Sequence, residues 1–209
     1  MCFCTFLGGQ PFPAGGYDLN LSPLLDGFLV EAGSACGTTL LDRARALLAE
    51  TSPEHIEARD RARAAARAKV DQNVAQAGLR NVSDLRERVR NSRSNPLWER
   101  LAQECVECAA CNFICPTCHC FLLVDVEERQ GFRRFKDWDA CLYRAFALEA
   151  AGANPRPRRA DRLHGRLEKK FDFLVANAGT WGCVGCGRCI EACAGRIDLR
   201  ETLRELIHA

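Results

Sequence analysis

Two stretches of the chain decide its fold: Cys105-Val-Glu-Cys108-Ala-Ala-Cys111-Asn-Phe-Ile-Cys115-Pro116 and Cys183-Val-Gly-Cys186-Gly-Arg-Cys189-Ile-Glu-Ala-Cys193-Ala194. Both have the spacing C-x2-C-x2-C-x3-C, and only the first is followed by proline. Three thiolates separated by two residues each can bind three iron atoms of a cubane, because the short loop brings the sulfurs together and turns backbone amides toward the cluster. The doubled spacing therefore predicts two [4Fe–4S] clusters.

The fourth ligand of each cluster comes from the other run. In two-cluster ferredoxins the last cysteine of each run binds the cluster of its partner run. We therefore predict a first site with Cys193 as its fourth ligand and a second site with Cys115 as its fourth ligand. The first site consists of Cys105, Cys108, Cys111 and Cys193, and the second site of Cys183, Cys186, Cys189 and Cys115. This exchange places the two clusters side by side in one domain.

Structural zinc is the main alternative, because zinc also binds four cysteines in C-x2-C pairs. Zinc needs only two such pairs and explains neither the third cysteine nor the duplication. The string Cys115-Pro-Thr-Cys118-His119 formally matches a haem-attachment motif, but covalent haem accompanies export, and Met1 to Gln10 lacks the positive start of a signal peptide. A thioredoxin-like role for the same cysteines needs a β–α–β setting that the flanks do not predict.

Composition narrows the class of protein. The chain has 209 residues with 14 cysteines, and 29 Lys and Arg against 27 Asp and Glu give a net charge of +2. This balance gives no reason to expect nucleic acid as a partner, and no stretch approaches the ~20 apolar residues that cross a bilayer. Many cysteines without an export signal indicate a cytoplasmic protein with metal or redox chemistry. Because no motif for NAD, flavin or ATP is present, electrons must enter and leave through partner proteins, and we predict no catalytic residues.

Three regions are expected along the chain. Residues 1–41 form a Gly/Pro-rich segment with short strands, such as one at Gly27 to Val30, and residues 42–95 form a helical region. A long helix in that region begins at Ser52-Pro53 and ends at Ala77-Gly78, because serine, proline and glycine are typical of those helix positions. Residues 96–209 form the dicluster domain, with helices predicted after Pro96, over Trp138 to Ala151, over Arg162 to Ala178, and after Asp198.

The segment between the two runs is expected to be helical as well. It holds 67 residues, 116 to 182, and it favours an α-helical ferredoxin-like scaffold over the compact β-containing one. The predicted fold class is therefore mainly α, with a small irregular or β N-terminal segment. A dry apolar shell around the clusters is predicted from Phe113, Ile114, Phe121, Leu142, Phe146 and Ile190.

The remaining polar and cysteine residues are open to more than one interpretation. Residues 156–170 carry seven Lys and Arg against Asp161 and Glu168, a local charge of +5. They are interpreted as balancing the negative clusters or as docking a partner, with a solvated helix face and a nucleic-acid surface as alternatives. The other six cysteines are either small buried hydrophobic residues or ligands of a third cluster. They are Cys2, Cys4, Cys36, Cys118, Cys120 and Cys141.

Several strings resemble a known family. They include Cys2-Phe-Cys4, Phe28-Leu-Val-Glu-Ala-Gly33, Cys115-Pro-Thr-Cys-His-Cys-Phe121, Trp138-Asp-Ala-Cys141, Gly152-Ala-Asn-Pro-Arg156 and Cys183-Val-Gly-Cys-Gly-Arg-Cys-Ile190. The chain resembles the iron–sulfur subunit that cytosolic NADP-linked sulfhydrogenases, where it is called the beta subunit, share with anaerobic sulfite reductases. The resemblance implies [4Fe–4S] clusters that pass electrons between a flavoprotein that binds NAD(P) and a catalytic subunit of the [NiFe] hydrogenase or sirohaem type.

These observations together predict an electron-transfer subunit of an oxidoreductase complex that is not catalytic alone. Two alternatives stay open at the level of sequence. In a protein like the corresponding part of heterodisulfide reductase, some of Cys118, Cys120 and Cys141 would take part in disulfide chemistry. In a zinc-stabilised interaction module, the same cysteine runs would hold zinc and no labile sulfide.

Overall fold

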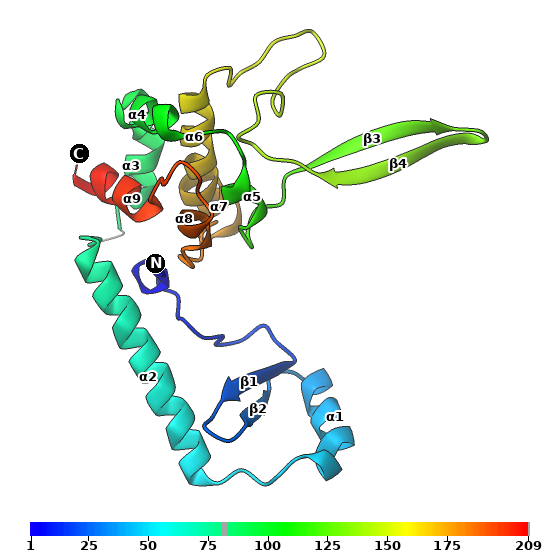
Figure 1. Ribbon diagram of the computed structural model, residues 1–209, viewed down its shortest axis with the longest axis vertical. Coiled ribbons are helices and arrows are strands. Elements are labelled where there is room, and N and C mark those ends of the chain that lie inside the picture. The colour runs from blue at the N-terminus through cyan, green and yellow to red at the C-terminus, as the bar shows by residue number, and fades with distance from the viewer. Residues whose placement is uncertain (81–82, 209) are drawn as a thin grey trace.

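The computed structural model describes residues 1–80 and 83–208. Figure 1 shows an N-terminal lobe at the bottom, a helical domain above it, and a two-stranded arm that projects from the helical domain. Helices contain 47% of the residues and strands 13%, which confirms the prediction of a mainly α protein. Within the described residues, no helix has both the length and the apolar character that a membrane span requires.

The N-terminal lobe is a hairpin followed by helices. Strands β1 (Leu19–Pro23) and β2 (Phe28–Ala32) pair antiparallel, with Leu21 opposite Val30. The expected strand near Phe28 is thus present. Helix α1 (Ala35–Ala44) and the 3-10 turn η2 (Arg45–Leu47) follow, so the segment expected to hold only loops and strands also begins a helix. Ser34 caps that helix, because its hydroxyl accepts a hydrogen bond from the Gly37 amide at 3.1 Å.

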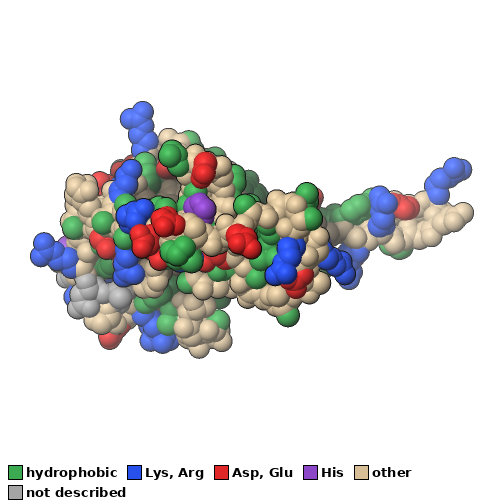
Figure 2. Space-filling model, turned by 90° about the horizontal axis from the view of Figure 1, so that it is seen from below, with side chains coloured by type: hydrophobic (Ala, Val, Ile, Leu, Met, Phe, Trp, Pro, Cys, Tyr) green, Lys and Arg blue, Asp and Glu red, His purple; other side chains and the backbone are tan. Residues whose placement is uncertain are grey.

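The long helix α2 (Pro53–Gln76) forms where its end signals predict it. Ser52 and His55 form a reciprocal capping box at its start, and Gly78 beyond its end has a left-handed φ of 68°. Its cations pair with neighbouring carboxylates, as in Arg61 with Glu57, which is the solvated helix face expected from the interleaved charges. Figure 2 shows the same mixture over much of the view from below, with blue and red side chains interspersed.

The helical domain contains the main core. It is built from helices α3 (Leu85–Asn91), α4 (Leu97–Glu104), α6 (Arg159–Glu168) and α9 (Leu199–His208), with a 3-10 turn η3 (Ser92–Ser94). Trp98 and Leu203 are buried at their centre, and the Trp98 ring lies edge-on to His164 with 5.2 Å between centroids. Full burial of such an apolar side chain contributes about 1.5–3 kcal/mol. The helices predicted after Pro96 and after Asp198 are both present.

One helix of this domain changes its winding midway. Helix α6 continues through a π-helical turn, η4 (Lys169–Phe173), into α7 (Leu174–Ala178), which covers the helix predicted over Arg162 to Ala178. The Leu174 amide bonds back to Lys169 O instead of Lys170 O. The freed Lys170 carbonyl accepts a hydrogen bond from the Gly182 amide at 2.7 Å. Single π turns of this kind are frequent at functional sites.

The segment between the cysteine runs is not all helical, which corrects two predictions. Strands β3 (Phe121–Glu128) and β4 (Gly131–Trp138) form a long antiparallel hairpin, with Val124 opposite Phe135. This is the arm that projects in Figure 1. Alternating Val and aromatic residues favour strands over helices here. The helix expected over Trp138 to Ala151 is absent, because Trp138 ends β4 and the residues after it form consecutive turns.

Candidate metal centres

The two cysteine runs adopt the same backbone path. The residue before the second cysteine is left-handed in both runs, with φ of 55° at Glu107 and 65° at Gly185. The residue after the second cysteine is also left-handed, with φ of 57° at Ala109 and 80° at Gly187. A short helix follows in each run, α5 (Ala110–Phe113) and α8 (Arg188–Glu191), and the two helices pack against each other. The sequence repeat is therefore a structural repeat.

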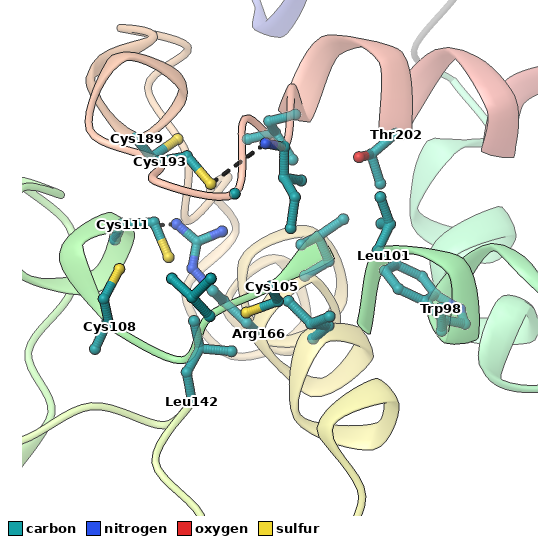
Figure 3. Close-up of a pocket in the computed structure, with 17 residues that line it drawn as sticks. Trp98, Leu101, Cys105, Cys108, Cys111, Leu142, Arg166, Cys189, Cys193 and Thr202 are labelled. Atoms are coloured by element: carbon teal, nitrogen blue, oxygen red, sulfur yellow. Dashed lines mark hydrogen bonds between the residues drawn. The ribbon is translucent and has the colours of Figure 1, made fainter. Parts of the chain in front are cut away.

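The first site brings together cysteines from both runs. Cys105, Cys108, Cys111 and Cys193 line one cavity of about 50 Å³ beneath the helical core, and Figure 3 shows their sulfurs around it. The backbone amide of Ile197 donates to Cys193 Sγ at 3.3 Å. Cys193 thus lies with the three cysteines of the other run, where the predicted exchange requires it.

The second site gathers the other four cysteines. Cys183 and Cys189 both lie within electrostatic range of Cys115, and Cys189 is also close to Cys186. The backbone amide of Gly185 faces Cys183 Sγ at 3.4 Å. Cys189 also lines the cavity of the first site, so the two sites adjoin. The ligand roles of all eight cysteines remain predictions, although the structure places them in these two groups.

The surroundings of the thiols shift their pKa values in opposite directions. Burial raises the pKa of Cys111 to about 11 and the pKa of Cys183 to about 11. A hydrogen bond from the Cys118 thiol lowers the pKa of Cys115, and Thr117 and the Lys170 ammonium act in the same direction. The buried thiols must lose protons to become ligands, so metal binding at these sites is coupled to proton release.

Three buried cations follow one face of the α6–η4 helix toward the cysteines. Arg162, Arg166 and Lys170 are spaced four residues apart and are 4%, 6% and 4% exposed. Arg162 forms an ion pair with Glu107. Arg166 donates to Cys111 O at 3.0 Å, and its Nε has no hydrogen-bond partner. Figure 3 shows the Arg166 guanidinium among Cys111, Cys189 and Cys193.

These cations provide a test of whether an iron–sulfur cluster fits. Among the described residues, no carboxylate pairs with Arg166 or Lys170, whose contacts are carbonyls, a hydroxyl and cysteine sulfur. Burying an unpaired charge costs several kcal/mol. A [4Fe–4S] cluster with four thiolates carries about −2 when oxidised and supplies the missing counter-charge. The donor set and the cations therefore fit clusters at both sites.

The apolar shell differs from the prediction. Leu142 and Ile190 are buried as expected, and Phe146 is half-buried. Phe113, Ile114 and Phe121 are 47%, 45% and 46% exposed, so their assignment to the shell was wrong. Phe113 and Ile114 lie at the end of the short helix α5, and Phe121 begins the projecting arm. The cavity wall comes instead from helices α4, α6 and α9 and includes Trp98, Leu101, Leu163, Leu167 and Leu199.

The N-terminal segment packs on the second run, a feature that the sequence did not predict. The Phe3 amide donates to Gly185 O at 2.7 Å, and Phe3 is fully buried. A Cβ on Gly185 would lie 2.6 Å from Cys4 Cα, and one on Gly187 would lie 2.8 Å from the Met1 carbonyl carbon. The glycines at these two positions are the only sequence signal of this close approach.

The six other cysteines divide into separate groups. Cys118, Cys120 and Cys141 line a small cavity of about 10 Å³, and the Asn112 amide donates to Cys141 Sγ at 3.2 Å. Cys2 and Cys4 lie together near the second run, whereas Cys36 is exposed on α1. Within the described residues, no three His, Cys, Asp or Glu side chains converge closely enough to hold a single metal ion. A third cluster stays a prediction.

Comparison with known proteins agrees with the arrangement of the two runs. A family model described as "4Fe-4S dicluster domain" matches residues 104–197. The chain is 31% identical over 211 residues to Sulfhydrogenase 2 subunit beta of Pyrococcus furiosus. That alignment covers 98% of this chain and 59% of the relative, so the chain spans a little over half the length of the relative. No solved structure matches. The resemblance inferred from the sequence motifs is confirmed.

Proposed function

Because this chain carries a 4Fe-4S dicluster domain and is a relative of a sulfhydrogenase beta subunit, we propose that it is an electron-transfer subunit. In this proposal it relays single electrons between an NAD(P)-linked flavoprotein and a catalytic subunit of the [NiFe] hydrogenase type. A sirohaem-containing sulfite reductase is the less favoured catalytic partner. In this proposal the chain passes electrons and does not itself bind the substrate.

The observation that carries this proposal is the interlocked pair of cysteine groups around an unpaired buried arginine. Cys193 lies with the first run, and Arg166 faces thiols of both runs. Zinc with four thiolates carries the same charge of about −2, so the buried cation by itself suits either metal. The third cysteine of each run and the duplication of the whole run favour clusters over zinc.

The residues of this chain have distinct roles in the proposal. The eight cysteines would hold two [4Fe–4S] clusters, each of which supplies a one-electron carrier when bound. The amides of Gly185 and Ile197 donate to ligand sulfurs at 3.4 and 3.3 Å and stabilise the thiolate form. The apolar side chains of helices α4, α6 and α9 limit access of water to the first site.

Both sites have an exposed residue beside a cysteine, which suits a relay. At the first site Cys108 is exposed and the neighbouring Val106 is 60% exposed. At the second site Val184 is 48% exposed. A partner that docks at either surface would place its own redox centre close to one cluster. Electrons would then not need to cross the helical core. The cytoplasmic location predicted from sequence belongs to this proposal.

The proposal is tested with the native complex isolated without oxygen. Addition of NAD(P)H, which reduces the flavoprotein, should produce the electron paramagnetic resonance signals of reduced [4Fe–4S] clusters. Addition of hydrogen, which reduces the catalytic subunit, should produce the same signals. Nickel in the complex would identify the hydrogenase-type partner, and sirohaem would identify the sulfite reductase type. Clusters that neither donor reduces within the time of turnover would contradict a relay.

A further inference from the structure

Lys170 distinguishes the two sites more sharply than any other charged residue. Its ammonium lies 3.2 Å from Cys115 Sγ, the predicted fourth ligand of the second site. The same nitrogen also donates to Thr117 Oγ1 at 3.1 Å and to Gly182 O at 3.0 Å. These contacts fix the charge against the second site. Since Lys170 is only 4% exposed, water screens the charge weakly.

The π turn explains how a lysine reaches this position. Its freed carbonyl accepts the Gly182 amide, which ties the helix to the start of the second run. Gly182 leaves room for this contact, because a Cβ there would lie 2.8 Å from Lys170 Cα and 2.4 Å from Leu174 Cδ1. The backbone and the side chain of Lys170 are therefore both engaged at the second site.

Arg166 faces cysteines of both sites, so its charge does not make one site electrostatically different from the other. It faces Cys111 of the first run, Cys189 of the second run, and Cys115. An arginine side chain is not deprotonated in proteins, so the buried guanidinium remains charged. Each site also receives one backbone amide, from Ile197 or from Gly185. Arg159 also reaches the first run, where it donates to Cys105 O at 2.7 Å, but it pairs with Glu107. After these contributions, Lys170 is the main remaining buried cation that lies at one site and has no carboxylate partner among the described residues.

We propose that Lys170 makes the second site, held by Cys183, Cys186, Cys189 and Cys115, the more easily reduced of the two centres. The inference rests on the proposed function, because it assumes a cluster at each site. A cluster gains one negative charge on reduction, from about −2 to about −3, and a cation hydrogen-bonded to a ligand favours the more negative state. Exposure of Cys108 at the first site acts in the opposite direction, but partial solvation of one ligand is weaker than a charge-assisted hydrogen bond.

This ranking has a consequence for the relay. An electron that arrives at the first site passes downhill to the second site and rests there. The second site is also the one on which the N-terminal segment packs, through Phe3 and Gly185. The resting electron is thus held on the side of the molecule where Val184 approaches the surface.

A redox titration followed by electron paramagnetic resonance tests the inference on the full-length protein. Wild type, Lys170→Gln and Lys169→Gln are compared after iron analysis has shown that each contains both clusters. Lys169 is the matched control, because it precedes Lys170 on the same helix but its ammonium faces His119 at 3.3 Å. A third protein, Cys186→Ser, identifies the signal of the second site, because the substitution perturbs that cluster alone.

We expect the second site of wild type to titrate at the higher potential. Lys170→Gln should lower the reduction equilibrium constant of that site at least tenfold, which for one electron is a shift of about 59 mV, and should leave the first site nearly unchanged. Lys169→Gln should leave both unchanged. An unshifted second site in Lys170→Gln, an equal shift at both sites, or a first site of higher potential in wild type would overturn the inference.

Arg166 provides an independent check of the same electrostatic argument. Arg166→Lys keeps the charge and should preserve the ranking, whereas Arg166→Gln should lower the potential of both sites together. A shift confined to one site would contradict the shared position of Arg166. If iron analysis finds no clusters in wild type, the proposed function itself fails. If clusters are present and the potentials do not follow Lys170, only this inference fails.

Discussion

Residues with left-handed φ angles set the backbone path of both cysteine runs. The two runs place different residue types at these positions. The second run uses Gly185 and Gly187, whereas the first run uses Glu107 and Ala109 in the same conformation. The difference has a steric cause, because the N-terminal segment packs against the second run and leaves no space for a Cβ at either glycine. In the first run Ala109 is also buried, at 1% exposed, but the packing there accommodates its Cβ and the Glu107 side chain, which pairs with Arg162.

A substitution at Gly185 tests this packing. Gly185→Ala combines left-handed strain, about 1–2 kcal/mol for a residue with a side chain, with a contact of 2.6 Å to Cys4 Cα. We expect the segment Met1 to Leu7 to be displaced and the buried Cys4 thiol to become reactive. The measurement is the rate at which Cys4 is alkylated in the iron-loaded protein, located by peptide mass spectrometry.

Gly179→Ala is the matched control for that experiment. Gly179 has nearly the same left-handed φ of 66°, but a Cβ there would meet no atom within 4 Å. Gly179→Ala should therefore be destabilised only by the strain of a left-handed residue with a side chain. It should keep Cys4 as protected as in wild type. Equal protection of Cys4 in Gly185→Ala and Gly179→Ala would show that the N-terminal segment does not depend on the close approach.

At the scale of residues, the sequence predicted which cysteines group together but not the residues that balance their charge. The spacing of the two runs predicts that Cys193 pairs with the first run, because dicluster proteins with this spacing exchange the last cysteine of each run, and the structure places Cys193 at the same cavity as that run. The basic segment 156–170 was noticed as a local excess of charge, yet only the structure distinguishes Arg162, which has Glu107 as partner, from Arg166 and Lys170. That distinction depends on what each side chain contacts in the folded chain, which composition does not contain.

At the scale of elements, the π turn η4 is held in place by one carboxylate. Asp172 in η4 is 6% exposed at its side chain and accepts hydrogen bonds from two arginines of α3, Arg86 at 2.7 Å and Arg90 at 2.7 Å. The Arg90 guanidinium, together with Arg86, lowers the pKa of Asp172 to about 2. This contact docks α3 on the turn that positions Lys170.

Asp172→Asn should lower the free energy of unfolding by about 2 kcal/mol, the usual range for hydrogen bonds to a charged group. The folded pKa lies below the unfolded value near 3.9, so the stabilisation is complete above that value and is lost only as the pH falls toward 2. Chemical denaturation of the iron-loaded proteins should therefore give the same difference at every pH between about 5 and 8.

The exposed pair of Asp125 and Arg134 on the projecting arm is the control for Asp172. Asp125→Asn should leave the denaturation midpoint unchanged, because solvent screens an exposed ion pair. A difference between wild type and Asp172→Asn that grows steeply between pH 6 and 8 would show that another group carries the effect.

Secondary-structure elements were predicted correctly where residues typical of helix ends mark their limits. The prediction failed where the alternation of apolar and polar residues along a strand determines the structure. Helix α2 begins and ends at its predicted signals, Ser52-Pro53 and Gly78. The hairpin β3–β4 was missed because its charged residues, such as the cross-strand pair Asp125 and Arg134, resemble an exposed helix in composition. A strand pattern of period two is present in Leu122, Val124 and Val126, but it is short and lies between segments with helical spacing.

At the scale of the whole molecule, the predicted exchange of ligands would tie distant parts of the chain into one domain. Cys115 and Cys193 each lie with the cysteines of the other run, and helices α5 and α8 pack against each other. The sequence predicts this interlocking from the repeat, and the ligand roles remain a prediction. The projecting arm and the N-terminal lobe could not be placed from sequence, because their positions depend on packing across the domain.

A ligand substitution tests the interlocking directly. Cys193→Ala should damage the cluster of the first site, although Cys193 belongs to the second run, because its sulfur lies with Cys105, Cys108 and Cys111. We expect loss of about one cluster, with the signal of the second site retained. Cys36→Ala, at an exposed position on α1, should change neither signal. Loss of the second signal alone in Cys193→Ala would reverse the assignment.

The most direct test of the central claim is the iron and acid-labile sulfide content of the protein purified without oxygen. Two four-iron clusters require about eight iron and about eight sulfide per chain, in a brown protein with little zinc. A colourless protein with zinc, no labile sulfide and far fewer than about eight iron atoms per chain would contradict the account.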